Sequence, residues 1–159
     1  MPDIVYFDSC VFLAWLKGED KRVDTIGELF ADAENKNLKI VTSTLSIAEV
    51  LNIQGAQSPI PKNQRDAVRK LFLNEWIITK SVNRRLAEIS QDMVWDHGIK
   101  PKDGIHIATA LVYKVPVFYS YDKGLTAKTN FTTDIGSIKI SEPIPPSQGI
   151  LALDYKRND

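Results

Sequence analysis

Short apolar runs alternate with amphipathic stretches along the chain. Four runs have the length and the bounding residues of buried strands, and they cover residues 4–7, 38–41, 76–79 and 115–119. A shorter run over 138–140 predicts a last strand. Because strands alternate with helical stretches, the pattern predicts an α/β fold with a central, mostly parallel β-sheet flanked by helices on both faces.

The stretches between these runs carry apolar residues at helical spacing. Helices are predicted over about residues 11–17, 21–36, 47–53, 62–74, 82–97 and 101–114. Hydroxyls at 42–44 can cap the third helix, Ser81 can cap the fifth, and Pro101 suits the first turn of the sixth. Gly18 and Gly98 are placed to end helices.

One domain is predicted over residues 1–142, followed by a proline-containing tail over 143–159 that drapes over the surface or is loose. A Gly- and Pro-containing loop is predicted over 55–61, and a turn over 122–124. The 159 residues are 43% hydrophobic and 25% charged, a balance that can form a buried core. The longest apolar run is far too short to cross a membrane, and no cleaved signal is evident, so a cytoplasmic location is expected.

The formal net charge is zero, but the charges are unevenly distributed. Residues 1–60 carry five basic and nine acidic side chains, a net charge of −4, and residues 61–159 carry fifteen and eleven, a net charge of +4. Bases are concentrated over 61–85. This strip is either a solvated helix face or a surface that meets phosphates.

Four carboxylates follow predicted strands. Asp8 directly follows the first strand, Glu49 lies about one turn into the helix after the second, Asp103 lies in a first helical turn, and Asp122 comes three residues after Tyr119. In an open α/β sheet, ligands bind outside the carboxyl ends of the strands. We therefore expect the four acids to gather at one sheet edge.

Each acid also has a purely structural interpretation. Asp8 can cap the following helix, and Glu49 can form a capping box with Ser46. Asp103 can interact with the helix dipole, and Asp122 can be an ordinary turn acid. These interpretations do not predict that all four acids lie together.

Clustered carboxylates repel one another, and a divalent cation relieves that repulsion. An all-oxygen site suits Mg²⁺ or Mn²⁺, whereas zinc is disfavoured because Cys10, His97 and His106 have no zinc-site spacing. Such a site hydrolyses phosphodiesters, with nearby bases to attract the anionic substrate. Candidate bases are Lys100, Lys102, Lys123 and the strip over 61–85.

Four segments resemble the motifs of the PIN-domain nucleases. They are VYFDS at 5–9, SIAEV at 46–50, KDGIHIATA at 102–110 and YSYD at 119–122. The resemblance extends over about residues 3–141, and the size is similar to that of the VapC-type toxins of toxin–antitoxin pairs.

The resemblance implies a PIN-like fold and a Mg²⁺- or Mn²⁺-dependent ribonuclease acting on RNA. It implies that the metal-site and catalytic acids are Asp8, Glu49, Asp103 and Asp122, with hydroxyls beside them at Ser9 and Ser120. Position 120 is usually threonine in the family, and an aromatic residue is common after the fourth acid, where this chain has Lys123. Asp134 is the alternative fourth acid. The family also implies an antitoxin partner and homodimerisation.

Other residues have simpler interpretations. We expect His106 to be a packed structural histidine, Cys10 a small core residue, and Trp76 a core residue. A non-enzymatic alternative is a PIN-like module that binds RNA or protein without cleavage. A phosphatase or phosphoacceptor fits poorly, since haloacid-dehalogenase-type phosphatases need a second Asp where this chain has Cys10.

Overall fold

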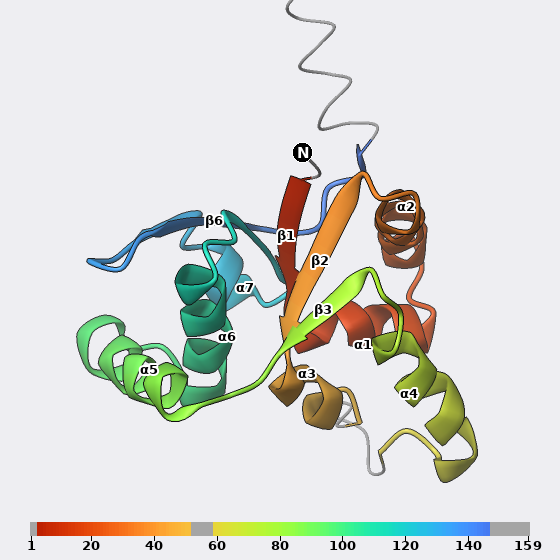
Figure 1. The fold of residues 1–159 in the computed structure, drawn as a ribbon, viewed down its shortest axis with the longest axis horizontal. Helices are drawn as coiled ribbons and strands as arrows, with labels where there is room; N and C mark the ends of the chain where they lie inside the picture. The colour runs from red at the N-terminus through yellow and green to blue at the C-terminus, as the bar shows by residue number, and fades with distance from the viewer. Residues whose placement is uncertain (1–2, 52–58, 147–159) are drawn as a thin grey trace, which may run out of the picture.

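The computed structural model describes residues 3–51 and 59–146 of the chain. Within these ranges, six strands form a single sheet in the order β3-β2-β1-β4-β6-β5 (Figure 1). The strands are β1 (Asp3–Phe7), β2 (Leu38–Ser43), β3 (Ile77–Lys80), β4 (Val117–Tyr119), β5 (Asn130–Thr132) and β6 (Ser137–Ser141). Every neighbouring pair is parallel except β5 and β6, which are antiparallel. The predicted α/β class and mostly parallel sheet are confirmed.

Helices connect the strands and cover both faces of the sheet. They are α1 (Ser9–Lys17), α2 (Arg22–Glu34), α3 (Thr44–Glu49), α4 (Arg65–Phe72) after a short 3-10 turn (Lys62–Gln64), α5 (Arg84–His97), α6 (Pro101–Val112) and α7 (Lys123–Thr126). Figure 1 shows α1, α2 and α4 on one side of the sheet and α5 and α6 on the other. None of the described helices is long and apolar enough to span a bilayer.

Two apolar cores result from the alternation of side chains along the strands. In β1, Phe7 points into the core shared with α1, α2 and α4, whereas Tyr6 points into the core shared with α5 and α6. Phe7 and Tyr6 are both fully buried. The prediction of helices on both faces is therefore confirmed.

Several local predictions need correction. The fifth helix is capped by Asn83, whose side chain accepts a hydrogen bond from the N–H of Leu86, and not by Ser81. The expected turn at 122–124 is the start of α7, and β5 was not predicted. Trp76 is only partly buried and precedes β3, although it packs against the core.

The loop over 55–61 and the tail over 143–159 are only partly covered, because residues 52–58 and 147–159 lie outside the described residues. The third predicted helix is α3: Ser43 caps it, as expected of the hydroxyls at 42–44, but the helix ends at Glu49 and does not continue to residue 53. Other predicted helix ends agree with the structure. Gly18 and Gly98 end α1 and α5 with left-handed backbone, and Pro101 is the first residue of α6.

Candidate functional site

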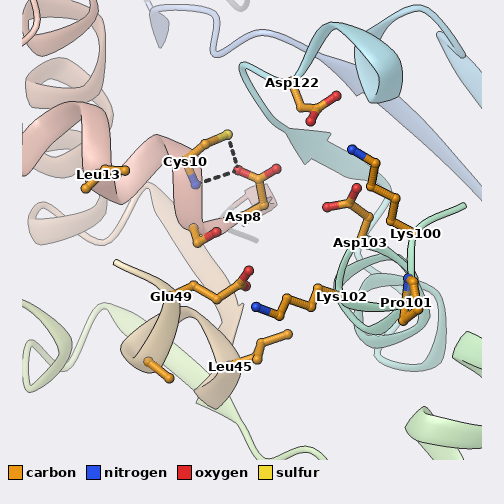
Figure 2. Close-up of a pocket in the computed structure, with 12 residues that line it drawn as sticks. Asp8, Cys10, Leu13, Leu45, Glu49, Lys100, Pro101, Lys102, Asp103 and Asp122 are labelled. Carbon is orange, nitrogen blue, oxygen red and sulfur yellow. Dashed lines mark hydrogen bonds between the residues drawn. The ribbon is translucent and has the colours of Figure 1, made fainter. Parts of the chain in front are cut away.

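All four predicted acids line one pocket at the carboxyl edge of the sheet (Figure 2). They come from four elements: the starts of α1, α6 and α7, and the end of α3. The pocket has a volume of about 920 Å³. Its lining residues are Asp8, Ser9, Cys10, Leu13, Leu45, Ala48, Glu49, Lys100, Pro101, Lys102, Asp103 and Asp122.

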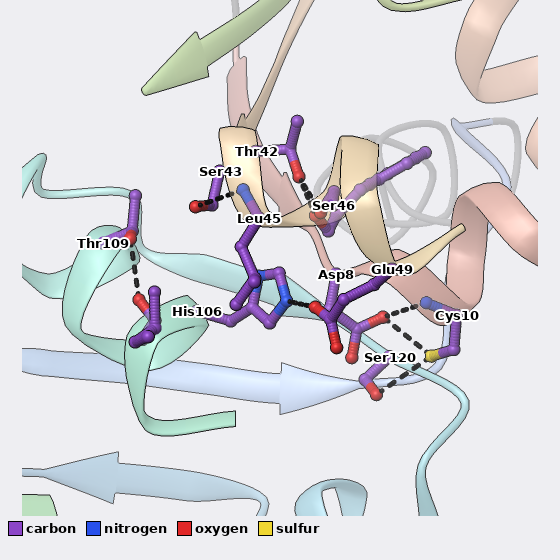
Figure 3. A network of polar contacts seen from close by, with 12 residues as sticks. Asp8, Cys10, Thr42, Ser43, Leu45, Ser46, Glu49, His106, Thr109 and Ser120 are labelled. Atoms are coloured by element: carbon purple, nitrogen blue, oxygen red, sulfur yellow. Dashed lines mark hydrogen bonds and ion pairs between the residues drawn. The ribbon is translucent and has the colours of Figure 1, made fainter. Parts of the chain in front are cut away.

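Asp8 is buried at the point where β1 passes into α1. Its Oδ1 accepts a hydrogen bond from the backbone N–H of Cys10 at 3.2 Å and one from the Cys10 thiol at 2.7 Å (Figure 3). Asp8 therefore caps α1, as its structural interpretation predicts, and it also lines the pocket. Burial raises the pKa of Asp8, while His106, Cys10 and Ser120 oppose that rise.

Cys10 lines the pocket and also packs against the core shared with α1, α2 and α4. Its Sγ lies 3.4 Å from Oγ of Ser120 and accepts a hydrogen bond from the N–H of Tyr121 at 3.2 Å. Ser120 is fully buried after β4, and its Oγ accepts from the N–H of Asp122 at 3.0 Å. The prediction that Cys10 is a core residue missed this link between α1 and the segment that follows β4, although the position of Cys10 two residues after Asp8 is a signal for it.

Glu49 is held by a buried histidine. Nε2 of His106 lies 2.6 Å from Oε1 of Glu49, and Nδ1 lies 2.7 Å from the hydroxyl of Tyr6. His106 is only 2% exposed, so the prediction of a packed histidine is confirmed, but its contact with a site acid was missed. The capping box of Ser46 and Glu49 is wrong, because Ser43 caps α3.

The acids influence one another electrostatically. The pKa of Asp103 is raised by burial first and then by the carboxylates of Asp122, Asp8 and Glu49, whereas His106 lowers it. Asp122 caps α7 by accepting from the N–H of Leu125 at 3.2 Å. These contacts describe a cluster of negative groups that a cation would stabilise.

The alternative acid, Asp134, lies on the exposed turn between β5 and β6 and does not line the pocket. Its position leaves Asp122 as the fourth acid of the pocket.

Two lysines approach the acids at the start of α6. Figure 2 shows Lys102 pointing toward Glu49, and Lys100 pointing toward Asp103 and Asp122. Ser9 lines the pocket, whereas Lys123 is exposed on α7 and is not among the lining residues.

The basic strip over 61–85 does not form one surface around the pocket. Lys62, Arg65 and Arg69 line a second hollow of about 390 Å³ with apolar residues of α3 and α4. Arg84 forms an ion pair with Glu88 at 2.7 Å on α5.

The donor set suits a hydrated divalent cation. The four acids offer only carboxylate oxygens, the ligands that Mg²⁺ and Mn²⁺ prefer. Among the described residues, no group of three or more His, Cys, Asp or Glu side chains is placed so that together they could hold a metal ion. Mg²⁺ commonly retains several waters and uses one or two protein carboxylates, so an open pocket of acids fits it.

The model of the PIN domain family matches residues 5–130 of the chain. A comparison of the chain with curated proteins finds no match. Among solved structures, the chain is similar to VapC20 of Mycobacterium tuberculosis, described as a sarcin–ricin loop cleaving toxin, with a TM-score of 0.63, 16% identity and coverage of 78% of this chain and 94% of that one.

Two further structures share the fold. A chain of a toxin–antitoxin complex from Klebsiella pneumoniae has a TM-score of 0.58 and 16% identity, covering 88% of this chain and 98% of its own. A chain of VapBC2 from Rickettsia felis, bound to a DNA fragment from its promoter, has a TM-score of 0.58 and 14% identity, covering 87% and 98%.

Proposed function

The chain belongs to the PIN domain family, and we propose that it is a metal-dependent endoribonuclease that hydrolyses RNA phosphodiester bonds. The observation that carries the proposal is the convergence of Asp8, Glu49, Asp103 and Asp122 on one pocket. No shared structural role explains why four acids from separate elements lie at that edge. Joint binding of a cation that acts on a phosphodiester substrate does explain it.

The four acids would hold Mg²⁺ or Mn²⁺. Such an ion, when bound, activates a water and neutralises charge on the leaving oxygen. Lys100 and Lys102 on the pocket wall attract the phosphate backbone of RNA, and Lys123 on α7 supplies positive charge further out. Ser120 orients the backbone that carries Asp122, and Ser9 offers a hydroxyl at the pocket wall.

We further propose that the chain is the toxin of a toxin–antitoxin pair. Support comes from the solved structures that share its fold, which include a toxin and two toxin–antitoxin assemblies. An antitoxin protein would block the acidic pocket most simply by placing an Arg or Lys side chain among the carboxylates. Homodimerisation is a second association to test, by measuring the mass of the chain in solution.

The experiment is cleavage of a labelled RNA over a series of Mn²⁺ concentrations. Asp8→Asn and Asp103→Asn should abolish cleavage, because each removes a carboxylate from the pocket. Asp134→Asn is the matched control, since Asp134 is exposed and outside the pocket, and it should cleave like the wild type. Products with 5′-phosphate and 3′-hydroxyl ends are expected from attack by water.

Full activity in both pocket variants would refute the nuclease proposal. RNA binding without cleavage at any Mn²⁺ concentration would instead support the alternative of a binding module.

A further inference from the structure

A buried network of hydrogen bonds extends from the core to the rim of the pocket. It begins at the Tyr6 hydroxyl, passes through both ring nitrogens of His106 and ends at Oε1 of Glu49, with contacts of 2.7 Å and 2.6 Å. Tyr6 and His106 are 0% and 2% exposed, whereas the Glu49 side chain is 20% exposed. These hydrogen bonds therefore connect the buried interior to the carboxylate of Glu49, which is the partly exposed member of the network.

The inner end of this network is fixed by packing. The Tyr6 ring stacks on Phe118 with centroids 4.9 Å apart and planes 10° apart. The same ring meets His106 edge-on, with centroids 5.8 Å apart. Tyr6 and Phe118 belong to the core beneath α5 and α6, and His106 is itself buried, so close packing holds the inner end of the network in place.

The hydrogen-bond directions follow from what each group can donate. The Glu49 carboxylate can only accept, so Nε2 of His106 carries the proton that joins them. The Tyr6 hydroxyl is fully buried against Nδ1 of His106 and has a proton to donate to it.

We propose that His106 is a positioning residue, which holds Oε1 of Glu49 so that the rest of the carboxylate faces the pocket. Glu49 is the last residue of α3, and within residues 3–51 and 59–146 its carboxylate has a hydrogen-bond partner in His106 alone. A glutamate on such a site otherwise samples several rotamers, which a fixed donor prevents. The proposal rests on the proposed function, in which Glu49 is a site acid.

Cleavage by matched variants tests the role. His106→Leu keeps the apolar volume without a donor and should lower RNA cleavage by about 10- to 100-fold, the range found when a partner of a metal ligand is lost. His106→Gln keeps an N–H donor and should recover most of that loss. Tyr6→Phe leaves His106 in place and should cause a smaller loss, which preserves the test if His106→Leu does not fold. Equal losses in His106→Leu and His106→Gln, both folded, would overturn the proposal.

A spectroscopic readout tests the contact without activity. The chain has two histidines, so ring ¹⁵N–¹H signals of the metal-free protein separate His106 from His97, whose ring meets Phe131 edge-on. We expect a slowly exchanging Nε2–H signal from His106 that shifts or broadens in Glu49→Ala, while the His97 signal stays in place. An unchanged His106 signal in Glu49→Ala would overturn the proposal. If the wild type cleaves no RNA, the proposed function fails, and this signal still decides whether His106 holds Glu49.

Discussion

Gly104 permits a close approach between α5 and α6 directly beside Asp103. A Cβ at position 104 would lie 2.5 Å from Oγ of Ser90, and 3.3 Å from the Ser90 Cβ and carbonyl oxygen. The same Oγ donates a hydrogen bond of 2.7 Å to the carbonyl of Pro101, in the first turn of α6. Gly104→Ala therefore forces the Ser90 hydroxyl away from Pro101 or pushes the two helices apart.

The cost follows from three contributions. The lost hydrogen bond is worth about 1 kcal/mol, and overpacking a filled interface costs about 1–3 kcal/mol. Alanine recovers up to about 1 kcal/mol of helix propensity. The net destabilisation expected for Gly104→Ala is thus about 1–3 kcal/mol, which lowers the midpoint of thermal unfolding by about 3–10 °C in a chain of this size. RNA cleavage should fall as well, because Asp103 moves with the turn.

Gly27 provides the matched control within the same chain. It lies inside α2, and a Cβ there would meet only the Trp15 ring, at 3.4 Å, which is an ordinary contact. Gly27→Ala should therefore raise the free energy of unfolding by about 0.5–1 kcal/mol. Thermal and urea unfolding of both variants provide the comparison. A Gly104→Ala variant stabilised as much as Gly27→Ala would refute the reasoning, and Ser90→Ala should reduce the cost of Gly104→Ala.

Three further predictions concern the pocket. Asp103→Asn should raise the midpoint of thermal unfolding at pH 7. The pKa of Asp103 is raised in the folded state, so the wild type loses stability as the pH rises through that pKa, and an asparagine does not. The gain should shrink toward pH 4, and thermal unfolding of both proteins from pH 4 to pH 7 checks this. Excess Mg²⁺ or Mn²⁺ should raise the midpoint of thermal unfolding of the wild type, because binding at roughly 100 times Kd adds about 2.7 kcal/mol to the free energy of unfolding. The midpoint should rise less in Asp8→Asn, and equal rises in both proteins would contradict binding of the ion through Asp8. The Cys10 thiol should react slowly with a disulfide reagent in the folded protein and quickly in denaturant, because burial and then Asp8 raise its pKa far above the ordinary range; fast labelling of the folded chain would contradict this.

The sequence predicts the sheet and the pocket because both depend on local order. An apolar strand followed at once by an acid, as at Asp8, places that acid at the carboxyl edge wherever the strand sits. The same rule applies to Asp122 after β4. The convergence of the acids follows from the parallel sheet and needs no knowledge of side-chain packing.

What the sequence did not predict depends on contacts between distant segments or on very short elements. β5 has three residues, of which only Phe131 is buried, so it is too short for a periodic pattern. The contact of His106 with Glu49 joins residues 57 positions apart. A partial signal exists, because Asp103 and His106 are three residues apart and share a side of α6.

The pairing of β1 has a consequence for how the chain is made. One neighbour of β1 is β2, but the other is β4, and Val5 pairs with Val117. During synthesis, the first strand therefore waits with one edge uncovered until more than a hundred further residues have left the ribosome. The acids at 103 and 122 emerge equally late. A polypeptide that ends before residue 103 lacks two of the four acids of the pocket. The complete pocket therefore forms only after most of the chain has been synthesised.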